Sequence, residues 1–434
     1  MPKRILYFLL LISLTGYILI GYYINRSNFP HLITIYGSLF LIAYLLQKHC
    51  TPNNFKVLLL SGILFRFCLI FSVPALSDDF YRFVWDGRIQ HLGINPFDFT
   101  PAQIIKQHSD PLLQNIFPYL NSPNYYSVYP QFCQSVFKIA SSIGGDNLYH
   151  AIIVLKSAIF LSELGTILLL KKLLSARNNA QSLQLIYVLN PLVIIELSGN
   201  IHFEAFMIVF MLLAVWLISK QRYISSAIAF SLAIQTKLLP LIFIPLLIKK
   251  IGIKKTSIYA IVCLIVTLLL CLTLLNTTER FLHFAESLRL YYGKFEFNGS
   301  FYLMFRSIGQ GILAYNPIAV LGKIMIVFAL SGMIWVYYRK FELLEGIFWL
   351  LTIYLSFSAV IHPWYLTPLV ALSAFIKFRF ALIWSALIPL SYYTYSKTPY
   401  SENYYITGIA YLIVYGFLLW EFKRKASPQA KKQT

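Results

Sequence analysis

Charged residues are scarce in this chain of 434 residues: only 12% are Asp, Glu, Lys or Arg, and only 16 are acidic. Soluble globular domains carry about 25% charged residues, so most soluble classes are excluded. A formal net charge of +20 is typical of some nucleic-acid-binding proteins, but those need a basic surface in water. Apolar runs extend almost from end to end here, and we therefore expect no nucleic-acid partner.

Cysteine is also scarce, and the positions of its five residues exclude a disulfide framework. Only Cys133 lies well outside the apolar runs, so no outer pair is available to form a bridge. The sequence has no visible internal repeat and no glycine-rich phosphate loop of the nucleotide-binding type. The missing phosphate loop argues against a nucleotide as a bound substrate.

What the chain does have is apolar length: 58% of its residues are hydrophobic and its mean hydropathy is +0.68. A transmembrane helix takes about 20 apolar residues, and fourteen runs approach that length. We therefore predict an all-α polytopic membrane protein with about 12–14 transmembrane helices. The fourteen runs cover residues 5–23, 31–47, 55–73, 149–170, 181–197, 204–219, 223–235, 238–248, 256–275, 317–337, 344–361, 364–375, 381–395 and 404–420.

The distribution of basic residues predicts which side of the membrane each loop occupies. If the N-terminus is cytoplasmic and the runs alternate, 22 of the 36 basic residues face the cytoplasm, with only three acidic ones. This is the usual positive-inside bias, and it places the C-terminus in the cytoplasm as well. The bias holds only if residues 223–248 are broken at Thr236–Lys237. The scheme therefore predicts Lys237 near the outer face, in or beside a cavity lined by broken helices.

This topology divides the chain into helical membrane parts and two large extracytoplasmic loops. The first loop holds all six aspartates of the protein. We expect N-terminal transmembrane helices in 1–73, the first loop in 74–148, central transmembrane helices in 149–275, the second loop in 276–316, C-terminal transmembrane helices in 317–421 and a basic cytoplasmic tail in 422–434.

The densest polar cluster, residues 77–88, opens the first loop. On a helix, Asp79, Arg82 and Asp86 share one face because they are three and seven residues apart. We predict an amphipathic helix in the outer membrane interface, with its apolar face in lipid and its carboxylates toward the protein. Asp78 and Asp79 could take a proton from a hydroxyl group or hold a divalent cation. The competing interpretation is a solvated helix cap with an ion pair between Asp79 and Arg82.

Four further polar clusters fall on the same predicted side. They are residues 200–204 with His202 and Glu204, Lys237, residues 362–365, and residues 129–131. Each has an ordinary structural explanation, since histidines cap helices, Trp and Tyr form interfacial belts and lysine can reach the headgroups. The agreement of all five clusters on one side favours a site.

Residues 77–88 and 93–97 resemble the first outer loop of GT-C glycosyltransferases, and more narrowly that of bacterial polyprenol-phosphate-mannose-dependent mannosyltransferases. Shorter pieces agree in order along the chain. They are Tyr129-Pro130, residues 190–192 with His202 and Glu204, residues 237–240, and residues 362–365. Relatives often have His-Asn-Asp where this chain has His202-Phe203-Glu204, so Glu204 keeps a carboxylate on a longer side chain.

The resemblance implies a multi-span transferase of a bacterial inner or plasma membrane. It would move a hexose, most often mannose, from a polyprenyl-phosphate carrier to a glycan or lipid acceptor on the extracytoplasmic face. An essential aspartate of the first loop would be the base, either Asp79, which we favour, or Asp78. No cofactor is implied beyond a possible divalent cation held by these two aspartates.

The physics of the implied reaction suggests roles for the remaining residues. Cations should contact the donor phosphate, and we assign this to Arg82, Arg88 and Lys237. His362 and Tyr365 would complete the pocket, with Trp364 packing on the sugar or the prenyl chain. We expect Asp86, Tyr129, His202 and Glu204 to support the site.

Three alternative functions stay open at this stage. A transporter or lipid flippase would suit the intramembrane charges Lys156, Glu163 and Glu196 and a broken helix pair, although the chain lacks visible repeat symmetry. Another GT-C member could transfer a different sugar, because sugar identity depends on pocket geometry. A non-catalytic assembly subunit is the third. The sequence does not specify the acceptor or the oligomeric state.

Overall fold

A computed structural model describes residues 1–313 and 317–426, and in these residues the regular structure is helical. The only extended pairing among them consists of isolated bridges from Phe297 and Asn298 to Val360. The predicted all-α class is therefore confirmed. Of the predicted tail 422–434, residues 427–434 lie outside the described residues.

Helices occur in every part of the predicted division of the chain. The N-terminal group is α1 (Lys3–Tyr22), α2 (Phe29–Lys48) and α3 (Pro52–Cys68). The first predicted loop forms α4 (Asp79–His91), α5 (Pro101–Gln107), α6 (Pro111–Ile116), η1 (Phe117–Tyr119) and α7 (Gln131–Gly144). The central group is α8 (Leu148–Ala176), η2 (Gln181–Gln184), α9 (Leu185–Val188), α10 (Pro191–Val193), η3 (Ile194–Gly199), α11 (Glu204–Ser219), α12 (Tyr223–Thr236), η4 (Leu239–Phe243), α13 (Ile244–Ile251) and α14 (Ile253–Cys271).

The second predicted loop and the C-terminal part complete the chain. The second loop contains α15 (Thr278–Lys294) and α16 (Phe301–Leu313). The C-terminal group is α17 (Ile318–Tyr338), α18 (Leu343–Phe357), η5 (Pro363–Leu366), α19 (Thr367–Leu372), α20 (Phe380–Leu387), η6 (Ile388–Ser396) and α21 (Tyr404–Ala426).

Six helices of the described residues are long and apolar enough to cross a membrane, or seven if the bent pair Gln181–Val188 and Pro191–Gly199 forms one span. Three further apolar helices are shorter, namely α11, α12 and α18. All fourteen predicted runs coincide with helical segments, but several of these are broken. A proline is the second residue of η4, α13 and α19 and explains many of the breaks, because proline cannot continue a helix hydrogen-bond ladder.

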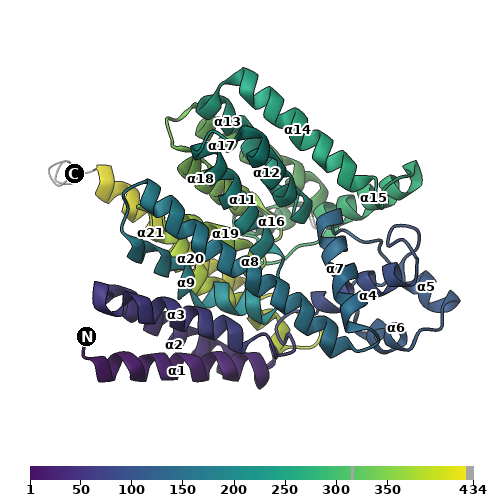
Figure 1. Cartoon of the computed structure of the whole chain (residues 1–434), viewed down its shortest axis with the longest axis horizontal. Coiled ribbons are helices and arrows are strands. Elements are labelled where there is room, and N and C mark those ends of the chain that lie inside the picture. Colours follow the sequence, from purple (N-terminus) through teal and green to yellow (C-terminus); the bar gives the residue numbers. More distant parts are fainter. Residues whose placement is uncertain (314–316, 427–434) are drawn as a thin grey trace.

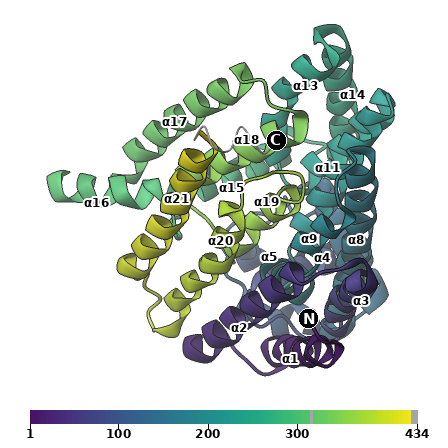
Figure 2. The same cartoon turned by 90° about the vertical axis from the view of Figure 1, so that its left-hand side faces the viewer.

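The break predicted at Thr236–Lys237 is present. Helix α12 ends at Thr236, and Lys237 is extended, with φ −157° and ψ 133°. Figure 1 shows the start of α1 and the end of α21 at one end of the helical body, and α4 to α7 together with α15 at the other. Figure 2 shows α1 to α3 at one edge of the body and α16 with α17 at the opposite edge. Elements of both predicted outer loops thus lie at the same end.

The prediction that α4 lays its apolar face in lipid is wrong. Phe80, Phe83, Val84 and Trp85 are all buried inside the protein, and the Phe83 ring stacks on that of Phe137 in α7, with centroids 4.8 Å apart. Apolar side chains on a helix need an apolar partner, but that partner can be another helix instead of lipid. Helix α7 and its neighbours provide it here.

Three intramembrane charges find partners that their spacing in the sequence could not reveal. The guanidinium Nε of Arg66 lies 2.6 Å from Glu163 Oε2, and both side chains are fully buried. Lys156 Nζ donates to the Leu69 carbonyl oxygen at 2.8 Å and to Ser72 Oγ at 2.7 Å. Buried charges are tolerated when they are paired or hydrogen-bonded. These contacts tie α8 to α3 and its C-terminal end.

Candidate active site

The first turn of α4 carries the two aspartates favoured as catalytic. Ser77 begins this turn: its Oγ accepts a hydrogen bond from the Asp79 backbone N at 3.3 Å. Asp78 makes no side-chain cap bond. Helix α4 ends at His91, and Gly93 follows with a φ of +82°, a left-handed conformation that glycine adopts without strain. The chain therefore leaves the helix direction at Gly93.

Asp79 is half-buried and has one neutral hydrogen-bond donor on its carboxylate: Asn121 Nδ2 donates to Oδ1 at 2.9 Å. Burial raises the pKa of Asp79 to about 6. The bond from Asn121 lowers this pKa, whereas the nearby charges of Asp78 and Glu204 raise it further. A carboxylate with such a pKa is ionised at neutral pH and is a stronger base than an ordinary aspartate.

Asp78 has a different environment, because it forms an ion pair with Arg26 from the turn between α1 and α2. The Arg26 guanidinium also lies over the ring of Tyr395, 4.6 Å from its centroid. Asp78 is therefore engaged by a cation that is itself held in place. Of the two adjacent carboxylates, Asp79 is the one without a charged hydrogen-bond partner.

Arg82 and Asp86 are buried structural partners. Arg82 Nε donates to Asp86 Oδ1 at 2.8 Å, and its Nη1 donates to the carbonyl oxygens of Ser122 at 3.1 Å and Tyr125 at 3.0 Å. Asp86 Oδ2 accepts from Gln134 Nε2 at 2.9 Å. Arg82 thus pairs with Asp86, and the structure has no ion pair between Asp79 and Arg82.

Arg88 lies farther along α4, where it binds Asp110 Oδ2 and Asp146 Oδ1, each at 2.6 Å. Nine residues of α-helix separate it from Asp79, a rise of about 14 Å. Its guanidinium therefore serves the packing of the first loop and does not join Asp79.

Lys237 and Glu204 come together beside Tyr365. Lys237 Nζ donates to Glu204 Oε1 at 2.5 Å and lies 3.4 Å from the centroid of the Tyr365 ring. The Lys237 side chain is 25% exposed and that of Glu204 only 7%. A ligand can therefore contact the lysine ammonium more easily than the Glu204 carboxylate. Three predicted clusters thus share this contact.

An aromatic stack joins the turn before α11 to the turn before η5. The His202 imidazole lies parallel to the Trp364 indole at 3.7 Å, and the His362 imidazole is parallel to the same indole at 4.4 Å. At these separations two rings cannot share one face without overlapping, so each covers one face of Trp364. Phe297 stacks on His362 at 4.7 Å. An imidazole lies against each face of the indole, which leaves less of Trp364 open to the sugar or prenyl chain predicted to pack there.

These groups also shift one another's pKa values. The charge of Glu204 raises the pKa of Asp79. Burial, and after it the charge of Lys237, lowers the pKa of His362 to about 3. Burial also lowers the pKa of His202 well below its usual range, with further contributions from His362 and Lys237. Both imidazoles are therefore neutral.

Tyr129 packs in a group of aromatic rings. Its ring packs edge-on against Phe83 at 5.0 Å and against Phe137 at 5.4 Å. Phe203, beside His202, contacts the same rings. Tyr129 thus belongs to the aromatic layer between α4 and α7.

Two residues of the site were not anticipated. Arg26 is one of few basic residues on the predicted outer side, and that placement was a usable signal. Asn121 has no sequence signal, because it lies in an irregular segment 42 residues after its partner Asp79. Only folding of residues 117–127 around the start of α4 brings them together.

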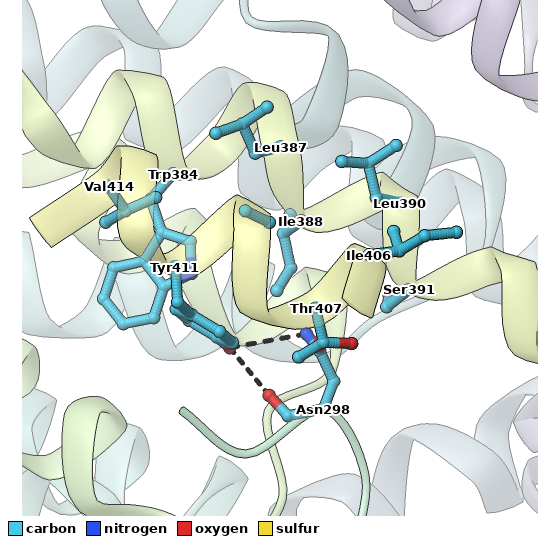
Figure 3. A pocket seen from close by; sticks show the side chains of 11 residues that line it. Asn298, Trp384, Leu387, Ile388, Leu390, Ser391, Ile406, Thr407, Tyr411 and Val414 are labelled. Carbon is cyan, nitrogen blue, oxygen red and sulfur yellow. Dashed lines mark hydrogen bonds between the residues drawn. The ribbon is translucent and has the colours of Figure 1, made fainter. Parts of the chain in front are cut away.

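No group of three or more His, Cys, Asp or Glu side chains in the described parts of the chain could hold a metal ion. Two hollows lie away from Asp79. One of about 830 Å³ is lined by Arg177, Glu345 and Lys377 among others. The other, of about 10 Å³, lies between η6 and α21 (Figure 3), where the Tyr411 hydroxyl donates to the Asn298 carbonyl oxygen at 2.7 Å. A volume of about 10 Å³ holds at most one water.

The helical fold with its membrane-length apolar helices, and a polar cluster at one end of it, define a polytopic membrane protein with a candidate active site. Residues 18–251 match the model of the MptA_B family, described as alpha-(1->6)-mannopyranosyltransferase, N-terminal domain. This match covers more than half of the chain, and the chain belongs to that family of mannosyltransferases. No curated protein and no solved structure matches the chain. The predicted resemblance to a mannosyltransferase family is confirmed.

The matched segment contains Asp78, Asp79, His202, Glu204 and Lys237. Residues 362–365 lie beyond it, although they contact its residues directly in the fold.

Proposed function

We propose that this protein transfers mannose from a polyprenyl-phosphate donor to a glycan or lipid acceptor on the extracytoplasmic face, with Asp79 as general base. The observation that carries the proposal is the state of Asp79: a half-buried carboxylate with a single neutral hydrogen-bond donor and a pKa of about 6. Membership of the mannosyltransferase family supports the transferred sugar and favours a transferase over a transporter or flippase.

In the proposed reaction, an acceptor hydroxyl attacks the anomeric carbon of the donor. The bond from that carbon to the phosphate oxygen breaks, a new bond to the acceptor oxygen forms, and the hydroxyl proton passes to Asp79. Polyprenyl phosphate leaves with the bonding electron pair. A positioned base contributes about 10²–10⁴-fold to such a step.

Lys237 is the proposed contact for the donor phosphate. Its ammonium is 25% exposed and is held by Glu204 and Tyr365, so a phosphate can approach a cation whose position is fixed in advance. Arg82 and Arg88 were expected to share this role, but their ion pairs leave them the task of positioning α4. A divalent cation on Asp78 and Asp79 has less support, because Arg26 already neutralises Asp78.

The side of the membrane follows from the charge distribution. Asp79 is the first residue of α4, and α4 lies with α5 to α7 and α15 at the end of the helical body opposite the start of α1 and the end of α21 (Figure 1). Positive-inside bias puts those termini in the cytoplasm. The site then faces the outer leaflet, where a polyprenyl-phosphate sugar would present its headgroup.

The test uses the purified full-length protein in lipid vesicles, with labelled polyprenyl-phosphate mannose and an α-mannoside acceptor. We expect wild-type transfer from this donor and none from a mannose nucleotide. Asp79→Asn should lose at least about 100-fold in rate, and Asp78→Asn clearly less. Asp146→Asn is the matched control, because the Asp146 side chain is 82% exposed. Near-normal transfer by a folded Asp79→Asn variant would contradict the proposal.

A further inference from the structure

The His202–Trp364–His362 sandwich leaves two imidazole nitrogens buried without a hydrogen-bond partner. They are Nε2 of His202 and Nδ1 of His362. The other nitrogen of each ring, Nδ1 of His202 and Nε2 of His362, does not belong to this set of buried unpaired atoms, so it is the one to consider for contact with a ligand. Native structures rarely leave buried polar groups unpaired without a reason.

The surroundings of the buried nitrogens assign the proton of each neutral ring. His202 Nε2 lies 3.7 Å from Glu196 Oε2, so a proton on Nε2 faces a carboxyl oxygen and Nδ1 is left as an acceptor. His362 Nδ1 has no acceptor nearby, and a buried N–H without a partner is rarer than a buried lone pair. The proton of His362 therefore belongs on Nε2, which makes that nitrogen a donor.

Glu196 is fixed in place for this role. It is fully buried and accepts hydrogen bonds from the hydroxyls of Tyr36 at 2.8 Å and Tyr392 at 2.9 Å. These tyrosines come from α2 and η6, so three parts of the fold converge on the carboxyl group that faces His202.

We propose that His202 and His362 recognise two different hydroxyl groups of the transferred sugar, His202 through Nδ1 as an acceptor and His362 through Nε2 as a donor. The inference rests on the proposed function and names its sugar-recognition groups. Trp364 acts as a positioning residue, because its two faces hold the ring planes. The charge of Lys237 lowers the pKa of both histidine rings. The two histidines therefore lie near Lys237, which is the proposed contact for the donor phosphate.

Amide side chains test the assignment, because asparagine places a polar atom near the Nδ1 position of histidine and glutamine near Nε2. His202→Asn and His362→Gln should therefore keep sugar recognition, whereas His202→Gln and His362→Asn should lose it. His202→Phe and His362→Phe keep a ring for stacking on Trp364 without any hydrogen bond. They are the controls for a purely structural role.

The readout is binding in the Asp79→Asn background, which prevents turnover. The affinity for polyprenyl-phosphate mannose is compared with that for polyprenyl phosphate, using the full chain in vesicles. The favourable variants should keep the preference for the mannosylated lipid within about threefold, and the unfavourable ones, with both Phe variants, should reduce it about tenfold or more.

Equal effects of Asn and Gln at both positions, or retention of the preference by the Phe variants, would overturn the inference. Absence of any preference for the mannosylated lipid would overturn it as well. If the predicted binding pattern appears but the protein with an intact Asp79 transfers no mannose, the sugar site stands and the proposed function fails. The two failures are thereby distinguishable.

Discussion

Asp79 and Asp86 belong to one short motif and to one face of α4, yet their surroundings differ completely. Asp86 is fully buried and its two oxygens are occupied by Arg82, Ser127 and Gln134. Asp79 is half-buried and accepts one hydrogen bond from a neutral amide. A carboxylate surrounded by donors holds structure together, whereas one with few donors keeps the capacity to accept a proton.

The same contrast separates the cations. The guanidinium groups of Arg82 and Arg88 donate to carboxylates and carbonyl oxygens inside the first loop. Lys237 has a single carboxylate partner and remains partly exposed. Most charged residues of 77–88 thus stabilise the packing of the first loop. The proposed chemistry involves the first turn of α4 and Lys237, which is far away in the chain.

The largest expected effect concerns Asp86. Asp86→Ala leaves the Arg82 guanidinium buried without its carboxylate, and removing one partner of a buried ion pair costs about 3–5 kcal/mol. We expect a matching loss of unfolding free energy, measured by denaturation of the protein in detergent. Asp146→Ala, at an exposed side chain, should change stability little. If the Asp86→Ala protein had normal stability but no activity, Asp86 would have a catalytic role and would not differ from Asp79 as proposed.

Lys237 provides the next test. Lys237→Gln removes the charge proposed to meet the donor phosphate, and hydrogen bonds to charged groups are worth about 1.5–3 kcal/mol. The donor KM should rise about 10- to 100-fold, and Lys237→Arg should recover part of this. Steady-state kinetics at varied donor concentration measure both. The matched control is Lys249→Gln, which removes a lysine whose Nζ donates to the Arg339 carbonyl oxygen. An unchanged donor KM in Lys237→Gln would place the phosphate elsewhere.

The pH dependence of transfer gives the smallest but most direct comparison. Since burial raises the pKa of Asp79 to about 6, the base is ionised above that pH and protonated below it. The rate should therefore be constant above about pH 7 and fall about tenfold per pH unit below pH 6. A pH–rate profile of kcat/KM measures this. A midpoint of the profile near the ordinary aspartate pKa of about 4 would contradict this assignment. It would indicate that the base is a solvent-exposed carboxylate, as Asp146 is.

Sequence reasoning predicted much of this arrangement correctly. The helical class, the break after Thr236 and the gathering of His202, Glu204, Lys237 and the segment 362–365 agree with the structure. The length of the apolar runs and the asymmetry of charge can be read from the sequence. They predict the fold class well because a bilayer permits few backbone structures to cross it. The lipid-facing apolar side of α4 was wrong, because spacing shows that a face is apolar without showing what covers it.

The sequence by itself therefore determined the class of protein and the end of the molecule where chemistry is expected, since both depend on composition and on local periodicity. Only the tertiary structure decided which aspartate keeps a carboxylate without a charged partner, and which arginines form buried ion pairs. It also decided that Trp364 is enclosed by two histidines. These outcomes depend on Arg26, Asn121 and His202, residues 42 to 162 positions away from the side chains they contact. A side chain's chemistry is set by such neighbours, and helical spacing reaches only three or four residues.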